Sequence, residues 1–110
     1  MSSIAGIEQA LFSTLAEDPD LGEIVDMFVD EMPDRIETLL ESFESQDWES
    51  LRRASHQLKG AAGSYGFAPI TPAAGSVEAA VKEARPEDEI RLVLDELVSM
   101  CRNVRTGTPS

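Results

Sequence analysis

Residues 47–67, DWESLRRASHQLKGAAGSYGF, have the apolar spacing of one amphipathic helix. On a helical wheel, where each residue turns by about 100°, the apolar side chains lie within about 80° of Leu51 and form one stripe. This stripe consists of Leu51, Ala54, Leu58, Ala61, Ala62 and Tyr65. Asp47 is suited to cap the start of the helix, and Gly66 to take the left-handed position after its end, with Phe67 packing on that cap. The segment therefore predicts a helix over 48–65 whose stripe faces a core.

Helical spacing of apolar residues also appears before this segment, and strand signals are nearly absent. The first predicted helix covers about residues 3–15, with Ser3 as its candidate N-cap. Its apolar positions are Ile4, Ile7, Leu11 and Leu15. The second predicted helix follows Asp20, which forms a capping box with Glu23. Its apolar positions are Ile24, Phe28, Met32, Ile36, Leu39, Leu40 and Phe43. They keep one phase across Pro33, so a single kinked helix is expected there.

Two more helices are expected after residue 67. Thr71 is the candidate cap of the fourth helix, with Pro72 at its first position. The buried side of this helix carries Val77, Val81 and Ala84. Pro86 starts the fifth helix, and residues 105–110 form a polar tail. The apolar face of the fifth helix carries Ile90, Val93, Leu94, Leu97, Met100 and Val104.

Five amphipathic helices with short connections indicate an all-α fold. We expect an antiparallel up-and-down four-helix bundle with an additional short N-terminal helix. The length of 110 residues fits a single domain over 1–110, with its core at about 20–104.

The composition narrows the classes of function. With 21 acidic and 9 basic residues the net charge is −12, which argues against binding of nucleic acids or anionic membranes. The lone cysteine, Cys101, cannot build a disulfide framework, and no apolar run approaches the ~20 residues of a membrane span. The N-terminus lacks the features of a signal peptide. We therefore expect a monomeric cytoplasmic protein, or a domain cut from a larger cytoplasmic one.

His56 is the only histidine, and the wheel places it about 140° from Leu51, facing solvent. Its helical neighbours Arg52, Arg53 and Lys59 are three of the nine basic residues, which argues against an incidental surface position. Because helical side chains lean toward the N-terminus, Lys59 leans toward His56 and is best placed to meet an anion on the ring.

Two glycines follow the histidine on the predicted solvent side. Gly60 lies one turn beyond His56, and Gly63 lies a further turn along. A glycine inside a helix costs about 0.5–1 kcal/mol relative to alanine. Close packing by another helix of the same chain would explain this cost, but the wheel turns both glycines outward. The closely packed partner is therefore expected to be another molecule.

Several chemistries are excluded by what surrounds the imidazole. An exposed histidine without a carboxylate–serine or cysteine partner is a poor hydrolase site. One histidine cannot build a metal site alone, and no phosphate-binding glycine loop supports ATP binding. What remains is an exposed nucleophile, because neutral imidazole can accept a phosphoryl group and pass it on.

The run HQLKGAAGSYG, residues 56–66, resembles the HxLKGxxxxxG pattern of histidine-containing phosphotransfer (HPt) domains in phosphorelays. The resemblance extends over about residues 20–104 and is specific when the motif lies on a helix of a bundle. This sequence has alanines at 61 and 62, where many members carry small polar residues. That departure touches no catalytic residue.

The resemblance implies a role for each motif residue. His56 would be the phosphorylated nucleophile, and Lys59 would offset the phosphoryl charge. Gly60 would permit close approach, and Gly66 would close the helix. Gln57 adjoins the histidine and is expected to support the phosphoryl group by hydrogen bonding.

The implied partners are response-regulator receiver domains, docking over Gly60, Gly63, Arg52 and Arg53, together with a hybrid sensor histidine kinase. The receiver would supply Mg²⁺, so the chain needs no cofactor or metal of its own, and it would be a phosphotransfer intermediate rather than a kinase. Two alternatives stay open. One is a histidine-bearing domain phosphorylated by a chemotaxis-type kinase, and the other is a module that docks receivers without accepting phosphate.

Overall fold

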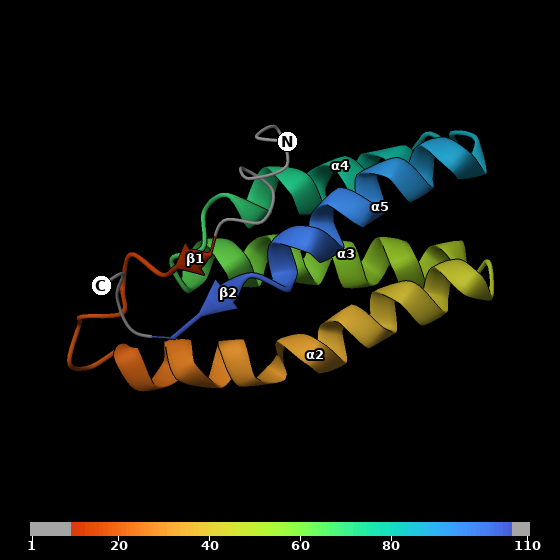
Figure 1. The fold of residues 1–110 in the computed structure, drawn as a ribbon. Helices are drawn as coiled ribbons and strands as arrows, with labels where there is room; N and C mark the ends of the chain where they lie inside the picture. Colours follow the sequence, from red (N-terminus) through yellow and green to blue (C-terminus); the bar gives the residue numbers. More distant parts are fainter. Residues whose placement is uncertain (1–9, 107–110) are drawn as a thin grey trace, which may run out of the picture.

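Four helices make up most of residues 10–106, the part of the chain that this computed structural model describes. They are α2 (Gly22–Glu44), α3 (Trp48–Ser64), α4 (Ile70–Lys82) and α5 (Glu87–Cys101). Consecutive helices run in opposite directions and pack into one helical bundle (Figure 1). Two short strands, β1 (Leu11–Phe12) and β2 (Val104–Arg105), lie toward the end of the bundle at which α2 begins.

The core lies where the apolar faces of the four helices meet. Leu51, Leu58 and Ala62 of α3 are buried, as the helical wheel predicts. Phe28 of α2 stacks on Phe67 with ring centroids 5.4 Å apart, which joins α2 to the end of α3. From α4 and α5 the core takes Ile70, Ala74, Val77, Ile90, Leu94 and Leu97.

The helix α2 continues through Pro33, as predicted, and bends along its length (Figure 1). Its buried face differs from the prediction at the first turn. Ile24 is 38% exposed, whereas its neighbour Val25 is buried in the core. A single residue turns by about 100° around the helix, so the apolar face enters the core one position later than predicted.

The predicted capping box of Asp20 and Glu23 is wrong. The helix begins at Gly22, and no side chain caps it. The main-chain carbonyl of Asp18 accepts hydrogen bonds from the amides of Leu21 and Gly22, and its carboxylate accepts one from the amide of Asp20 at 2.8 Å. Asp20 therefore lies inside a turn closed by Asp18, where it cannot cap the helix.

Both predicted ends of α3 are confirmed to within one residue. The Asp47 carboxylate accepts a hydrogen bond from the amide of Ser50, which caps the start. At the other end, Gly66 has φ +84°, and the amide of Phe67 donates to the carbonyl of Ala62 at 2.8 Å. This is the hydrogen bond that follows a left-handed glycine at the end of a helix.

The later helices differ from the prediction at their boundaries. The helix α4 begins at Ile70, and Thr71 lies inside it and donates from its hydroxyl to the carbonyl of Lys59. Thr71 is therefore not the cap. Ala84 lies beyond α4, exposed, with φ +54°. Pro86 directly precedes α5, as predicted, but Val104 belongs to β2 rather than to the helix.

The predicted N-terminal helix is not seen. Its first part, with Ser3, falls on residues 1–9, which lie outside the described residues. Its second part contains the strand β1, which pairs in parallel with β2. Because Arg105 belongs to β2, it is part of a strand rather than of the predicted polar tail. The amide of Leu11 donates to the carbonyl of Asn103, and the amide of Thr14 donates to the carbonyl of Gly66. These long-range bonds use the amides that a helix would need.

Between residues 10 and 106, none of the helices is long and apolar enough to cross a membrane.

Candidate functional site

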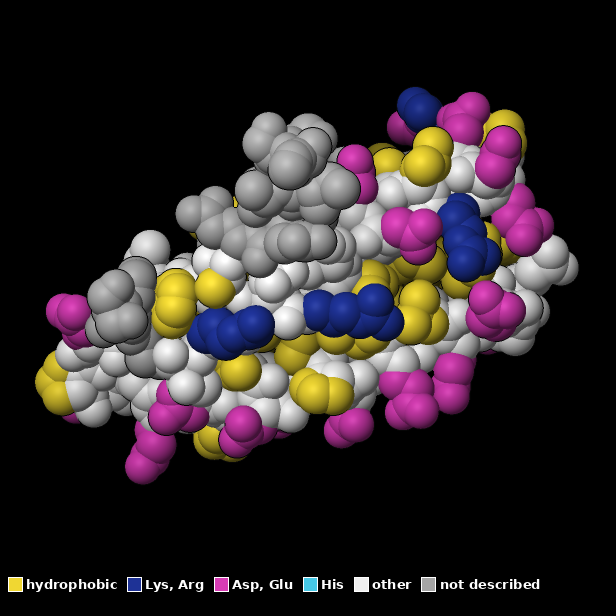
Figure 2. Space-filling view, in the orientation of Figure 1, with side chains coloured by type: hydrophobic (Ala, Val, Ile, Leu, Met, Phe, Trp, Pro, Cys, Tyr) yellow, Lys and Arg dark blue, Asp and Glu magenta, His cyan; other side chains and the backbone are white. Residues whose placement is uncertain are grey.

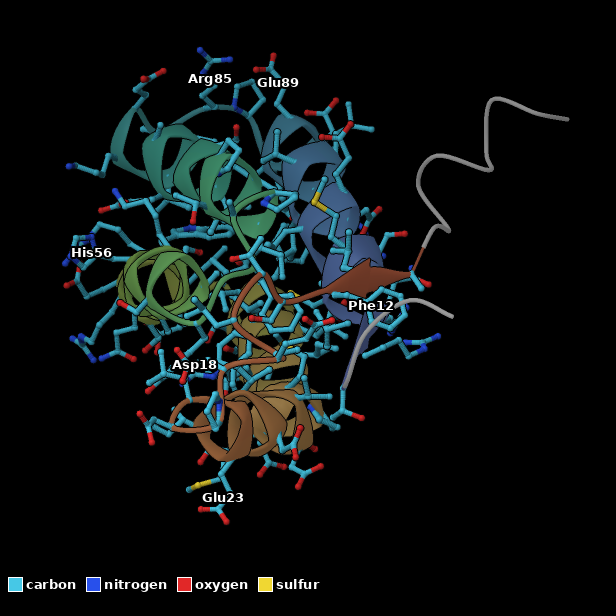
Figure 3. The ribbon with its side chains drawn as sticks, turned by 90° about the vertical axis from the view of Figure 1, so that its left-hand side faces the viewer. Phe12, Asp18, Glu23, His56, Arg85 and Glu89 are labelled. Carbon is cyan, nitrogen blue, oxygen red and sulfur yellow. The ribbon has the colours of Figure 1, made fainter. Side chains whose placement is uncertain are left out.

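The helix α3 presents His56 to solvent, as the wheel predicts. Its side chain is 61% exposed, and Figure 3 shows it projecting away from the bundle. The face drawn in Figure 2 shows acidic and basic side chains around apolar ones, and no histidine is visible on it. The imidazole can therefore be reached from solvent, while the opposite side of its helix is held in the core.

A carboxylate from the neighbouring helix meets the imidazole. Glu78 of α4 has its Oε2 2.9 Å from Nδ1 of His56 and its Oε1 2.8 Å from Nζ of Lys59. The Glu78 side chain is only 8% exposed, although both partners are much more open. Among the described residues, Oε2 contacts His56 and Oε1 contacts Lys59, so the three side chains form a connected cluster.

The cluster determines which ring nitrogen of the neutral His56 carries the proton and which keeps its lone pair. The hydrogen bond from Lys59 holds the pKa of Glu78 below its ordinary value, and the His56 hydrogen bond adds to this while burial opposes it. Glu78 is therefore a carboxylate, which can only accept hydrogen bonds. In the neutral imidazole, Nδ1 of His56 therefore carries the proton and donates it to Glu78, and Nε2 keeps the lone pair.

The stem of Lys59 lies along α4. A Cβ placed on Gly75 would lie 3.6 Å from Cδ of Lys59, so this stretch of α4 passes close to the methylene groups. The hydroxyl of Thr71 also donates to the main-chain carbonyl of Lys59. The ammonium therefore reaches Glu78 across the contact between α3 and α4.

The two glycines differ in their surroundings. A Cβ on Gly60 would meet no atom within 4 Å, which agrees with the predicted open face. A Cβ on Gly63 would lie 3.5 Å from the Thr71 hydroxyl oxygen, so Gly63 is exposed but lies beside the start of α4. The prediction that both face solvent is thus confirmed fully for Gly60 and only on one side for Gly63.

Glu49 pairs with both arginines of this face. Its carboxylate lies 2.6 Å from Arg52 and 3.7 Å from Arg53. The pairing with Arg52 lowers the pKa of Glu49 and raises that of Arg52. The positive charges of Arg52 and Arg53 are therefore partly neutralised within their own helix. Gln57 is exposed and lines a groove of about 90 Å³ between α2 and α3.

Cys101 and the possible metal-ligating residues are the candidates for a second site within the described part of the chain. Burial raises the pKa of Cys101 to about 12, so its thiol stays protonated. Within residues 10–106, no group of three His, Cys, Asp or Glu residues could hold a metal ion.

The sequence reasoning missed Glu78. A signal was present, because Glu78 lies four residues after Ala74 and three before Val81, on the face that α4 buries. A carboxylate on a buried helix face needs a cation or hydrogen-bond donors. His56 and Lys59 of α3 provide these donors. Their contact with Glu78 depends on how α4 packs on α3, which the sequence pattern does not give.

One comparison with known proteins supports the family resemblance of the sequence. The model of the Hpt domain family matches residues 23–107, from the first turn of α2 to just beyond β2, and the match includes His56. Comparisons with curated proteins and with solved structures gave no match. Because the family model covers well over half of the sequence, the chain belongs to the Hpt domain family.

Proposed function

We propose that His56 accepts a phosphoryl group from the phospho-aspartate of a receiver domain and passes it to the aspartate of another receiver in a cytoplasmic phosphorelay. Membership of the Hpt family implies histidine phosphotransfer in a phosphorelay, and Hpt domains are phosphotransfer intermediates. The observation that carries the proposal is the solvent-facing imidazole whose Nδ1 is bound by Glu78, which leaves Nε2 as the nucleophile.

The transfer step balances without a further reactant. The lone pair of Nε2 forms the N–P bond while the P–O bond to the receiver aspartate breaks, and its electrons remain on that carboxylate. The ring then carries the phosphoryl group on Nε2 and the proton on Nδ1, so it is cationic. The negative charge of Glu78, whose Oε2 lies 2.9 Å from Nδ1, stabilises this positive charge on the ring. The reverse reaction on a second receiver returns the neutral imidazole.

The protein contributes mainly position to this step, because phosphoryl transfer needs in-line approach and electrostatic support. The receiver would bring Mg²⁺ in its own acidic pocket. It would dock over α3, with Gly60 and Gly63 giving room and Arg52 and Arg53 offering positive charge. Gln57 would hydrogen-bond near the phosphoryl group.

The direct test is phosphoryl acceptance. The protein is incubated with phosphorylated receiver domains, and the bound label is examined for acid lability and mapped to a residue. Acid-labile label on His56 is the expected result. Label that appears only with a kinase catalytic domain and ATP would favour the chemotaxis-type alternative. Receiver binding without any label would favour a docking module and overturn the proposal.

Gly60 gives a prediction in which stability and transfer change in opposite directions. Gly60→Ala should stabilise the fold by about 0.5–1 kcal/mol, because the added methyl group enters open space on a helix. Gly60→Gln should also fold. Transfer should fall in the order Gly, Ala, Gln, because the side chain covers the approach to His56. Thermal melts and transfer rates on the same variants measure both effects.

Two results would contradict this role of Gly60. If both substitutions lower the melting temperature while the folded fraction transfers normally, Gly60 serves internal packing and not receiver approach. Equal transfer by all three proteins at unchanged stability would likewise remove its role in docking.

A further inference from the structure

A groove runs between α2 and α5 on the face drawn in Figure 2, where no histidine is visible. It consists of two hollows of about 370 and 600 Å³ that share Arg102 as a lining residue. The α2 side of this α2–α5 groove is lined by partly or fully exposed apolar residues, Val29, Pro33, Ile36 and Leu40. Their separations of four, three and four residues are those with which one helix packs along another. The groove therefore exposes an apolar seam that a further helix is suited to cover.

The other edge of the groove is basic. Arg91 lies in α5 and Arg102 directly after it, and both line the groove. Arg105 lies in β2, next to a further lining residue, Val104. Arg91 pairs with Asp95 on the same edge at 3.8 Å. Within residues 10–106, Arg102 and Arg105 form no ion pair, whereas every other arginine pairs with a carboxylate. In a protein of net charge −12, these two guanidinium groups are therefore left for carboxylates of another molecule.

The outer edge of α2 carries the opposite charge. Three carboxylates lie seven residues before, four after and eleven after Pro33, which places all of them within about 40° of it around the helix. They are Asp26, Glu37 and Glu44, and all are exposed. In the part of the chain that the structure describes, none of the three forms an ion pair. Figure 2 shows acidic side chains along the α2 side of this face and basic ones in a row above them.

We propose that the α2–α5 groove is the interface of a homodimer. When a second copy is turned by 180° about the long axis of the groove, the acidic edge of its α2 faces the basic edge of the first copy. The apolar seams of the two α2 helices then meet between these edges. Because such an interface is two-fold, each contact between the copies occurs twice.

The turn also determines which charges meet, because it leaves each residue at the same level along the groove. Arg102 lines the groove together with Ile36 and Leu40, so it lies level with the middle of the seam. Glu37 directly follows Ile36 in the sequence. The dimer therefore brings Glu37 of the second copy toward Arg102, and Arg102 of the second copy toward Glu37.

A second copy supplies everything that the groove requires of an occupant. It must bring apolar side chains to the seam, carboxylates to Arg102 and Arg105, and cations to the acidic edge of α2. The same face of the protein carries all three. The net charge of −12 on each copy opposes association, so the dimer depends on these local pairs. The monomer expected from the sequence would then hold only at low protein concentration.

The dimer leaves the candidate functional site open. His56 projects from the other side of the bundle, and Figure 3 shows it on the side away from α5. Both imidazoles of the dimer would therefore face solvent, where receivers approach. The inference does not rest on phosphotransfer, and transfer by Arg102→Glu should equal that of the wild type.

Charge reversal across the groove tests the proposal. Analytical ultracentrifugation measures the dissociation constant of the dimer for wild type, Arg102→Glu and Glu37→Arg. Each change should raise this constant by about 10-fold, because an exposed ion pair is replaced by like charges at two symmetric contacts. An equimolar mixture of the two variants should dimerise like the wild type, because each introduced charge then faces its opposite at both contacts.

Arg85→Glu is the matched control. It makes the same change of charge at an arginine that lies outside the groove and pairs with Glu83 and Glu89. Its dimer should have the dissociation constant of the wild type. Circular dichroism and thermal melts check that every variant is folded.

Three results would overturn the inference. The first is a wild type that stays monomeric up to about 1 mM, where even weak association is measurable. The second is a dimer that neither Arg102→Glu nor Glu37→Arg weakens. The third is a mixture of the two variants that remains monomeric, since another surface would then face Arg102. None of these results bears on phosphoryl acceptance, which is measured separately with phosphorylated receivers.

Discussion

His56→Gln is expected to abolish phosphoryl acceptance and to leave the helical bundle folded. The side chain is 61% exposed, so its packing contributes little to stability. Glutamine removes the nucleophilic nitrogen, yet its amide can still donate to the Glu78 carboxylate, which keeps that buried group hydrogen-bonded. Phosphoryl acceptance should therefore be lost because the nucleophile is missing, and not because the protein unfolds. Acid-labile label after incubation with phosphorylated receivers measures acceptance, and circular dichroism with a thermal melt measures folding.

Two results would contradict the role of His56. Acid-labile phosphate on the variant would place the acceptor elsewhere. An unfolded variant would show that the imidazole is needed for the fold itself. A helpful comparison is His56→Ala, which also removes the donor to Glu78. It should lose acceptance equally and should be less stable than the glutamine variant.

Gly66→Ala is expected to cause the largest loss of stability. The residue has φ +84°, which costs a residue with a side chain about 1–2 kcal/mol. A Cβ there would also lie 2.9 Å from the amide nitrogen of Thr14 and closer still to the hydroxyl of Ser13. Because the backbone must move, we expect a total loss of about 2–5 kcal/mol from strain and overpacking together. Urea unfolding measures it.

The matched control is the same change at the first glycine of the motif. Gly60→Ala adds the same methyl group to open space and should raise stability slightly. In Gly66→Ala, hydrogen exchange should also become faster at the amide of Thr14, which donates to the Gly66 carbonyl in the wild type. Wild-type stability in Gly66→Ala would mean that the segment around Thr14 does not pack on the end of α3.

Local signals explain why α3 could be predicted from the sequence. Asp47 and Gly66 act on the backbone within a few residues of themselves, and the apolar stripe needs only the helical period. The exposure of His56 and Gly60 follows from the same period. These predictions needed no knowledge of the other helices.

The errors lie where distant residues decide the structure. Residues 10–15 have helical spacing, but Asn103 and Gly66 supply backbone partners that the pattern cannot reveal. Thr71 looked like a cap, yet its hydroxyl bonds to the preceding helix. Glu78 was missed because its role arises from the packing of α4 on α3. A charge within a buried helical face was the available clue.

The parallel pairing of β1 with β2 has a consequence for tethering. The two strands bring residues near both ends of the described chain side by side, pointing in the same direction. Figure 3 shows Phe12 of β1 on the opposite side of the molecule from His56. The chain therefore enters β1 and leaves β2 on the side of the molecule away from the imidazole. A donor receiver tethered through either strand would need a connection long enough to reach around the bundle, and the length of that connection would then set its effective concentration at His56.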